Sequence, residues 1–226
     1  MSSTKILVGI DGTGAFFDST YAKEMANSFV NRLAGKAGDN TGYWRGPITP
    51  GGGLTDAINQ AFHFIEQKVK STRGLRSVIL TGYSRGATGV VVIASKLQKI
   101  GIEVDAMLLF DCVDMHLFFD AETIPQNVRN ALHLTRQAEA GSRTGWGNDA
   151  IFYYPEHTKL DRWSYLCTHG AMGGVPSVPS GDETGSSLVK EFGTIGTTNV
   201  TYNDDAKTSA VIWADVQPFC LQHGFI

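Results

Sequence analysis

The chain has 226 residues, of which 42% are hydrophobic, a size and composition that suit one globular domain with a single core. Its formal net charge is −3 and it contains no long basic run, so it lacks the electrostatic footprint of a nucleic-acid-binding protein. No segment approaches the ~20 consecutive apolar residues needed to span a bilayer. We therefore expect one domain over residues 1–226.

Three cysteines, Cys112, Cys167 and Cys220, are spread along the chain without a C-x-x-C pair. An odd and sparse count favours free thiols in a reducing compartment over a disulfide framework, and it argues against a metal site built on cysteine. The N-terminus, MSSTKILVGIDGTG, has only a short apolar run and does not resemble a secretory signal. We expect a cytoplasmic protein, with secretion by a signal-peptide-independent route left open.

The first half of the chain alternates between two kinds of apolar pattern. Residues 5–10 and 77–80 are short apolar runs that predict buried strands. Residues 17–34 and 54–69 carry apolar side chains at helical spacing and predict two amphipathic helices. Residues 36–53 are rich in Gly, Asn, Thr and Pro and predict a long loop.

The second half continues the alternation. A C-terminal helix is expected to be interrupted or to end near Pro218, because proline disrupts a helix interior. Strands that alternate with helices predict an α/β fold with a mainly parallel central sheet and helices on both faces. The predicted elements are a helix over 87–97, strands over 104–110 and 131–134, a Gly/Pro/Ser loop over 170–186 and a helix over 206–222.

The sharpest motif is G-Y-S-R-G at residues 82–86, which fits the G-x-S-x-G nucleophile elbow. It lies directly after a predicted strand and before a predicted helix, as the chemistry requires, since the strained turn projects the serine from the sheet edge. The helix N-terminus would add positive potential for a developing oxyanion. Ser84 is therefore the candidate nucleophile; a plain turn with a serine N-cap is the alternative.

A serine nucleophile requires a base, and the base requires an orienting acid. Asp111 ends the strand over 104–110, at the sheet edge where the serine emerges, and Asp114 is the alternative acid. Five histidines follow the serine. His133 lies in an apolar strand pattern that favours a packed side chain, whereas His169 lies on a glycine-rich loop that can reach the nucleophile. The residues alone leave His169 about level with the other four.

The first turn, G-I-D-G-T-G at residues 9–14, lacks both the G-x-G-x-x-G pattern and the P-loop lysine. Position 9 is glycine, which excludes the aspartate-nucleophile phosphatase signature; a phosphate-binding loop of another kind remains an alternative. In a serine hydrolase, such a loop supplies the second oxyanion N–H. Gly12 and Thr13 suit that role, together with Arg85, the residue after the serine.

Several segments together resemble the α/β-hydrolase domain of type VI secretion phospholipase effectors and their bacterial and fungal relatives. These segments are D-G-T-G-A at 11–15, the G-Y-S-R-G-A elbow at 82–87, D-C-V at 111–113 and H-G-A-M-G-G at 169–174. The resemblance implies a catalytic triad of Ser84, Asp111 and His169, without cofactor or metal. It also implies that Arg85 pairs with Asp11 and so braces the oxyanion loop.

The expected substrate is a carboxylic ester, with a phospholipid as the finer possibility and peripheral contact with a membrane compatible with it. The apolar residues Leu117, Phe118 and Phe119 follow the acid and either fill the core or form an acyl-binding wall. A thioesterase or amidase with the same triad remains an alternative. A non-catalytic or phosphate-binding α/β module is the rival from another class.

Overall fold

The computed structural model describes residues 4–36, 38–49, 52–74, 76–114 and 119–226. A six-stranded sheet, parallel throughout, forms its centre in the order β2-β1-β3-β4-β6-β8. A small antiparallel pair, β5 (Val113–Asp114) and β7 (Gly147–Asn148), lies apart from it. The strands of the main sheet are β1 (Thr4–Ile10), β2 (Thr41–Trp44), β3 (Arg76–Tyr83), β4 (Ala106–Phe110), β6 (Asn130–Arg136) and β8 (Lys159–Tyr165).

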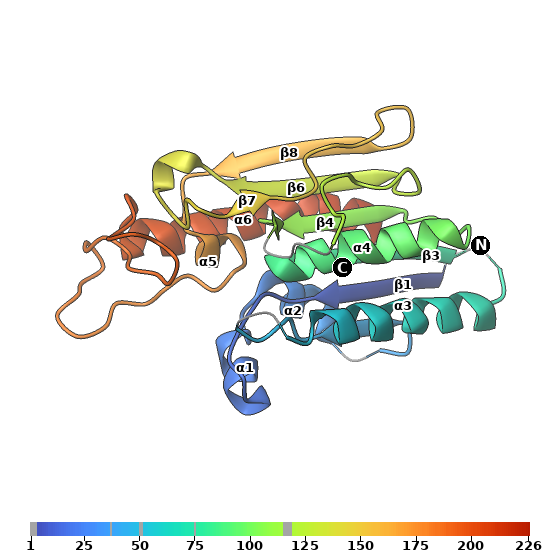
Figure 1. Ribbon diagram of the computed structural model, residues 1–226, viewed down its shortest axis with the longest axis horizontal. Helices are drawn as coiled ribbons and strands as arrows, with labels where there is room; N and C mark the ends of the chain where they lie inside the picture. Colours follow the sequence, from blue (N-terminus) through green and yellow to red (C-terminus); the bar gives the residue numbers. More distant parts are fainter. Residues whose placement is uncertain (1–3, 37, 50–51, 75, 115–118) are drawn as a thin grey trace.

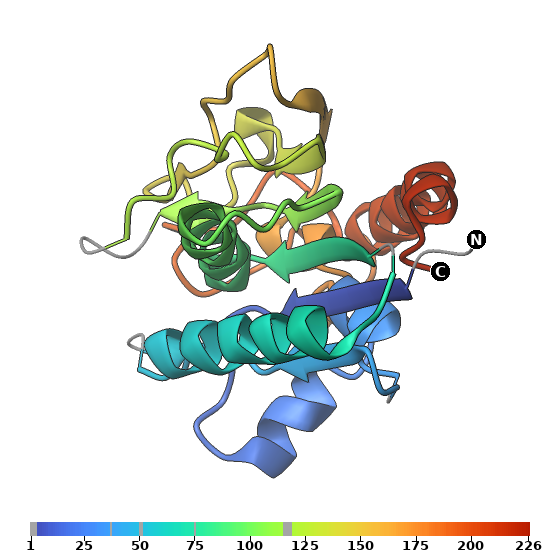
Figure 2. The ribbon, with the colours of Figure 1, turned by 90° about the vertical axis from the view of Figure 1, so that its right-hand side faces the viewer.

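Helices cover both faces of this sheet (Figures 1 and 2). Helices α3 (Leu54–Ser71) and α4 (Arg85–Lys99) pack on the face that receives Ile6 and Val8, while α2 (Phe29–Ala34), α5 (His169–Met172) and α6 (Tyr202–His223) pack on the face that receives Leu7. The short helices α1 (Asp18–Glu24) and η1 (Ala138–Ala140) complete the set. Because successive strand residues point to opposite faces, one strand feeds both cores. The predicted α/β architecture is confirmed.

Three predicted elements differ from the structure. The helix expected over 17–34 is split into α1 and α2, because Ser28 caps the second helix by accepting a hydrogen bond from the Asn31 N–H. Strand β2 lies inside the segment 36–53, which was predicted to be a loop. Helix α6 continues past Pro218 to His223, because the residues beyond the proline are held by the core.

The chain order of the strands places a crevice at one edge of the sheet. Strand β1 pairs with β2 on one side and with β3 on the other, so the sheet has a topological switch point between β1 and β3. In open α/β sheets, ligands bind outside the carboxyl ends of the strands at such a point. The turns after β1 and β3 meet there, and Figure 1 shows α5 and the segment before α6 at the same end of the sheet.

Candidate active site

The turn between β3 and α4 holds Ser84 in a strained conformation. Its backbone angles are φ 57° and ψ −131°, a region that residues with a side chain rarely adopt. A Cβ atom on Gly82 would lie 2.6 Å from the backbone of α4, and one on Gly86 would lie 2.2 Å from the carbonyl oxygen of Asp11. The two glycines therefore permit the close packing that places the serine at the carboxyl edge of the sheet.

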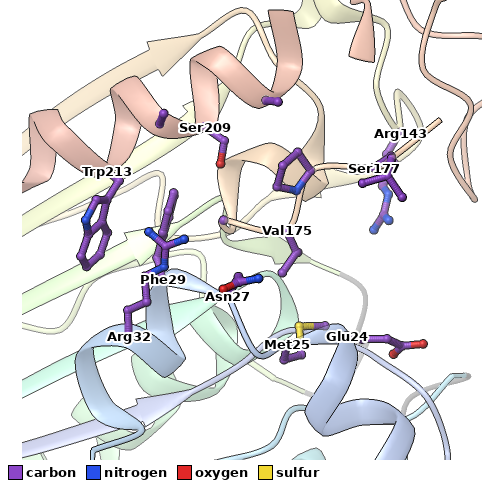
Figure 3. Close-up of a pocket in the computed structure, with 15 residues that line it drawn as sticks. Glu24, Met25, Asn27, Phe29, Arg32, Arg143, Val175, Ser177, Ser209 and Trp213 are labelled. Carbon is purple, nitrogen blue, oxygen red and sulfur yellow. The ribbon is translucent and has the colours of Figure 1, made fainter. Parts of the chain in front are cut away.

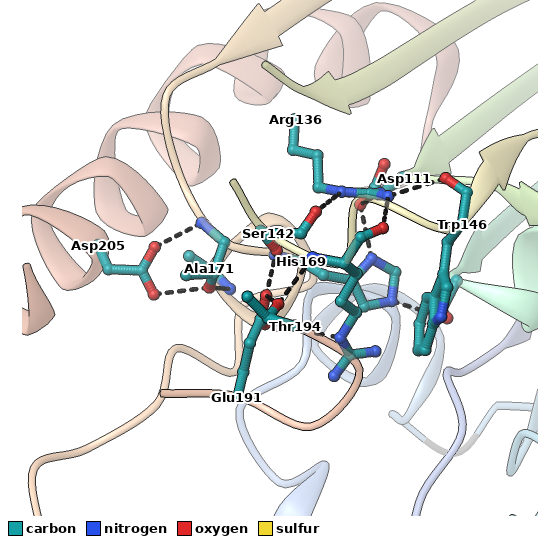
Figure 4. A network of polar contacts seen from close by, with 12 residues as sticks. Asp111, Arg136, Ser142, Trp146, His169, Ala171, Glu191, Thr194 and Asp205 are labelled. Carbon is teal, nitrogen blue, oxygen red and sulfur yellow. Dashed lines mark hydrogen bonds and ion pairs between the residues drawn. The ribbon is translucent and has the colours of Figure 1, made fainter. Parts of the chain in front are cut away.

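Two side chains from distant segments form a series of contacts that begins at this serine. His169 begins α5, and its Nε2 lies 2.8 Å from Ser84 Oγ. Asp111 directly follows β4 with a φ of 47°, and its Oδ2 lies 2.5 Å from His169 Nδ1 (Figure 4). All three residues are buried. The structure thus brings the three residues singled out in the sequence into one chain of contacts, with the order of a Ser-His-Asp triad.

The protonation states of His169 and Asp111 are set by burial and by neighbouring groups. Burial lowers the pKa of His169 to about 4, although the Asp111 carboxylate acts in the opposite direction. For Asp111, burial alone would raise the pKa, but His169 and Arg136 outweigh it through charge and hydrogen bonds and hold the pKa below its usual range. At neutral pH the imidazole is therefore neutral and the carboxylate ionised, the state in which a histidine can accept a serine proton.

Arg136, at the end of β6, fixes the position of the carboxylate. Its Nη1 donates to Asp111 Oδ2 at 2.5 Å, the oxygen that also contacts His169. Its Nε and Nη2 donate to carbonyl oxygens within residues 142–146 (Figure 4). Trp146 in turn lies edge-on to the imidazole, with ring centroids 5.3 Å apart. Arg136 was not among the residues predicted from the sequence; the available signal was a charged side chain two positions after the strand predicted over 131–134.

Two further networks hold the backbone of the histidine segment. Ser142 Oγ accepts a hydrogen bond from the His169 N–H at 2.9 Å and donates one to Glu191. Asp205 accepts from both the N–H and the hydroxyl of Thr168, each at 2.7 Å. These positioning residues come from separate loops and from α6, and no local motif marks them in the sequence.

The loop after β1 passes close to the serine turn, and its geometry corrects the assignment of Gly12. The Gly12 N–H donates to Asp11 Oδ1 at 2.9 Å and is therefore engaged rather than free to bind an oxyanion. A glycine is needed there for space, since a Cβ atom would lie 2.5 Å from the Tyr83 ring. The Thr13 N–H has no acceptor among the described residues, so Thr13 remains the candidate donor on this loop.

Arg85 braces this loop through a different partner from the one predicted. Its Nε donates to Thr13 Oγ1 at 2.7 Å. The Asp11 carboxylate instead accepts from the hydroxyls of Ser28 and Tyr43, so the predicted pairing of Arg85 with Asp11 is wrong. Burial raises the pKa of Asp11 to about 6. The loop after β1 is still held against the serine turn, by the threonine hydroxyl.

Two of the alternative residues, His133 and Asp149, have other surroundings. His133 is buried within β6, where burial lowers its pKa to about 4, in agreement with its interpretation as a packed histidine. Asp149 accepts a hydrogen bond from Thr88 Oγ1 at 2.8 Å. Asp114 belongs to β5, whose backbone pairs with β7. Asp111 occupies the place beside the histidine that these carboxylates would have needed.

The expected acyl-binding wall is not supported at the one position that can be examined. Leu117 and Phe118 lie outside the described residues. Phe119 packs against the hydrophobic core that includes α3 and α4. This packing favours the core alternative for Phe119, in line with the usual preference of aromatic side chains for interiors.

A cleft of about 550 Å³ opens beside the serine turn. Its lining combines Thr13 and Arg85 from the two turns with the aromatic side chains of Phe16, Trp146 and Phe192. Apolar walls with a few polar groups are typical of small-molecule sites. This cleft is the candidate binding site for the group that reacts with the serine.

The described residues show neither a metal-binding cluster nor a membrane-spanning helix. The described residues contain no group of three or more His, Cys, Asp or Glu side chains arranged to hold a metal ion. None of the helices in that part of the chain has the length and apolarity required to cross a membrane. The three cysteines are buried and form no disulfide.

The parallel sheet and the strained serine turn define an α/β-hydrolase-like fold. No family model and no curated protein matches the sequence. Solved structures with a similar fold include a YdeN-like hydrolase from Pectobacterium atrosepticum, with 12% identity, a TM-score of 0.39 and coverage of 74% of this chain and 80% of that one.

Two further structures are similar in the same way. An uncharacterised protein from Pseudomonas aeruginosa has 13% identity and a TM-score of 0.44, and the match covers 76% of this chain and 42% of that one. The esterase rPPE has 15% identity and a TM-score of 0.43, with coverage of 77% and 69%. At these identities and TM-scores the three structures carry no argument about the substrate.

Proposed function

We propose that the protein is a serine hydrolase that cleaves carboxylic esters through an acyl-enzyme. The observation that carries the proposal is the chain of contacts from Ser84 through His169 to Asp111 at a strained strand-to-helix turn. A serine hydroxyl is a weak nucleophile until a base accepts its proton, and the base must be held in the correct tautomer. In this site His169 is the base for the serine proton, and Asp111 is the group that holds its tautomer.

In the first half of the reaction, His169 Nε2 takes the proton of Ser84 Oγ while the oxygen attacks the ester carbonyl carbon. The carbonyl electron pair moves to its oxygen, which accepts hydrogen bonds from the N–H groups of Thr13 and Arg85. The second of these belongs to the first residue of α4, and the N-terminus of a helix favours a developing negative charge. The imidazolium, stabilised by Asp111, then protonates the leaving alkoxide.

In the second half, a water molecule attacks the ester bond to Ser84 and gives a proton to His169 Nε2. Collapse of this intermediate releases the carboxylic acid, and the imidazolium returns its proton to the serine oxygen. Proton transfers of this kind contribute about 10²–10⁴-fold each, and oxyanion donors a similar factor. The chemistry requires no metal or cofactor.

The finer form of the proposal is a lipid-like ester, including a phospholipid. It rests on the resemblance of the motifs to phospholipase effectors and on the aromatic side chains Phe16, Trp146 and Phe192 beside the serine. Thioesters and amides could be cleaved by the same three residues. A panel of acetate esters, longer acyl esters, phospholipids, thioesters and amides assigns the substrate class.

Ser84→Ala should lower kcat for the best ester by about 10⁴–10⁶-fold, because the nucleophile is removed. A fluorophosphonate probe should label the wild type and not the variant. Ser95→Ala, on the same helix but away from the site, is the matched control and should behave as wild type. Retention of more than a tenth of the activity by Ser84→Ala would refute the nucleophile. Absence of labelling together with phosphate binding at residues 11–14 would favour a phosphate-binding module.

A further inference from the structure

A second and larger groove continues the cleft beside the serine. It has a volume of about 960 Å³ and lies between the start of α2, the segment 174–178 and α6 (Figure 3). Glu24 and Arg143 line both cavities, so the two adjoin. A ligand that is longer than the cleft can therefore extend from the serine into this groove.

Apolar side chains contribute to the walls of the groove beside polar ones. Val175 and Trp213 are partly exposed there, and the buried side chains of Met25 and Phe29 complete the apolar part of the lining. The rings of Phe29 and Trp213 are stacked with centroids 5.2 Å apart. Such a surface favours an extended apolar group, because each methylene removed from water strengthens binding up to about fourfold.

A cation marks the end of the groove that is remote from the cleft. The Arg32 guanidinium lies 5.5 Å from the Phe29 ring centroid and 5.2 Å from that of Trp213. In the part of the chain that the structure describes, no carboxylate lies within ion-pair distance of it. Figure 3 shows this side chain beside the two rings, while Glu24 and Arg143 lie at the opposite end.

Charge is therefore distributed unevenly along the groove. Glu24 is the acidic side chain of the lining, and it lies at the cleft end, where its Oε2 accepts a hydrogen bond from the Ala15 N–H. The guanidinium of Arg32, which lies beside the two stacked rings, presents a planar set of donors suited to a carboxylate. The remote end thus favours an anion after an apolar stretch.

We propose that this groove is a second subsite, which binds the part of the ester remote from the scissile bond. Its ligand is an elongated apolar group that ends in a carboxylate, with Arg32 as the partner of the anion. The inference rests on the proposed ester hydrolase function and names its substrate class: long-chain esters with an acidic terminus.

The kinetic test compares p-nitrophenyl esters of long α,ω-dicarboxylic acids with esters of the same length whose far carboxylate is methylated. A parallel series carries the long acidic chain on the alcohol side. In wild type, KM should be about tenfold lower for the free carboxylate in one of the series, as expected for a charged hydrogen bond. Arg32→Gln should bring the ratio of the two KM values towards one, whereas Arg73→Gln, an exposed arginine outside the groove, should retain it.

A second variant tests the apolar wall. Trp213→Ala should reduce the preference for long esters over acetate by about tenfold, since several methylenes lose their contact. Leu221→Ala, an exposed position on the same helix, should leave the preference unchanged. Equal ratios for Arg32→Gln and Arg73→Gln, or a wild type indifferent to the charge in both series, would overturn the proposal.

Binding separates this inference from the proposed function. Calorimetric titration of Ser84→Ala with a long dicarboxylate should show binding that is weakened about tenfold when Arg32→Gln is added. If no ester is hydrolysed but this binding is observed, the hydrolase proposal fails and the groove stands. If acetate esters are cleaved through Ser84 but the dicarboxylate does not bind, the groove proposal fails alone.

Discussion

Arg136 sets the electrostatic environment of the proposed triad. Its guanidinium and the imidazole of His169 share one oxygen of Asp111, so that two positive or potentially positive groups compete for the same carboxylate. A cation at this place stabilises the ionised acid, but it opposes the protonation of the histidine. The arrangement favours a neutral base over a wide range of pH.

The pH dependence of kcat/KM should reveal this effect. In wild type, the midpoint of the acid limb, where kcat/KM rises with pH, should lie below the ordinary histidine pKa of about 6.5, because burial lowers the pKa of His169 to about 4. Arg136→Gln removes a charge that lowers this pKa, so the limb should move to higher pH. The loss of a charged hydrogen bond to Asp111 should also lower kcat by about 10–100-fold.

Arg136→Lys, which keeps the charge, is the control for this shift. Its acid limb should stay near that of wild type even if kcat falls, because the lysine cannot reproduce the fork of donors to residues 142–146. A limb that moves to lower pH in Arg136→Gln, or by the same amount in both variants, would contradict this account.

At the residue scale, the sequence analysis was most informative where chemistry requires a local pattern. The elbow motif around Ser84 and the segment of His169 carry such patterns, and the structure brings Ser84 into contact with His169, which in turn contacts Asp111. The contacts of Arg136 and Glu191 depend on chain segments that meet only after folding. Such positions could not be assigned from a single sequence, because no local spacing encodes them.

At the scale of elements, the contact between α4 and the end of β1 depends on one glycine. A Cβ atom on Gly86 would lie 2.2 Å and 2.4 Å from the carbonyl oxygens of Asp11 and Ile10, which are backbone atoms that cannot move aside cheaply. On Gly89, in the next turn of the helix, the nearest atom is Leu54 Cδ1 at 3.1 Å, a side chain able to adjust. The two glycines therefore differ in what they permit.

Gly86→Ala should lower the free energy of unfolding by about 3 kcal/mol or more, since overpacking against fixed atoms outweighs the better helix propensity of alanine. Gly89→Ala should change it by less than about 1 kcal/mol, because the two effects nearly cancel. Urea denaturation monitored by circular dichroism provides the measurement. Equal effects of the two substitutions would show that the close approach at Gly86 does not limit packing.

Two strands of the main sheet that the sequence did not reveal share a physical cause. Strands β2 and β8 form the two edges of the sheet, and their residues are mostly half-buried or exposed, so they lack the apolar runs that mark central strands. Helix α6 continues beyond Pro218 because Cys220 and Phe225 belong to the core, and tertiary contacts there outweigh the local preference. Local patterns predicted the centre of the fold better than its margins.

At the scale of the whole molecule, access to the serine is limited by segments from different parts of the chain. Ser84 and His169 are only 2% and 1% exposed. Residues 142–146 lie over the imidazole, and they are tied to the segment before α6 through Glu191. We therefore expect the access of a substrate carbonyl to Ser84 Oγ to depend on movement of these segments.

Glu191 joins the two segments through several contacts. Its carboxylate accepts hydrogen bonds from Ser142 Oγ and from Thr194 Oγ1, the latter at 2.9 Å, and lies 3.5 Å from Arg143 Nε. Thr194 Oγ1 also accepts from the Arg143 N–H at 2.8 Å. Removal of this carboxylate should therefore loosen the cover as well as the support of His169.

Glu191→Ala should increase amide hydrogen exchange within residues 142–146 by about tenfold, because hydrogen bonds worth about 1–2 kcal/mol are lost from the closed state. Loss of the Glu191 carboxylate also perturbs His169, so the absolute rate of labelling by a fluorophosphonate does not measure access to Ser84 alone. The ratio of the rates for a bulky and a small fluorophosphonate corrects for that effect and should rise. Glu183→Ala, which removes contacts with Tyr202 and Lys190 in the same region, is the matched control and should leave the ratio unchanged. If Glu191→Ala alters neither exchange nor the ratio, the carboxylate supports the histidine without restraining the cover, and access to Ser84 must be controlled by other contacts.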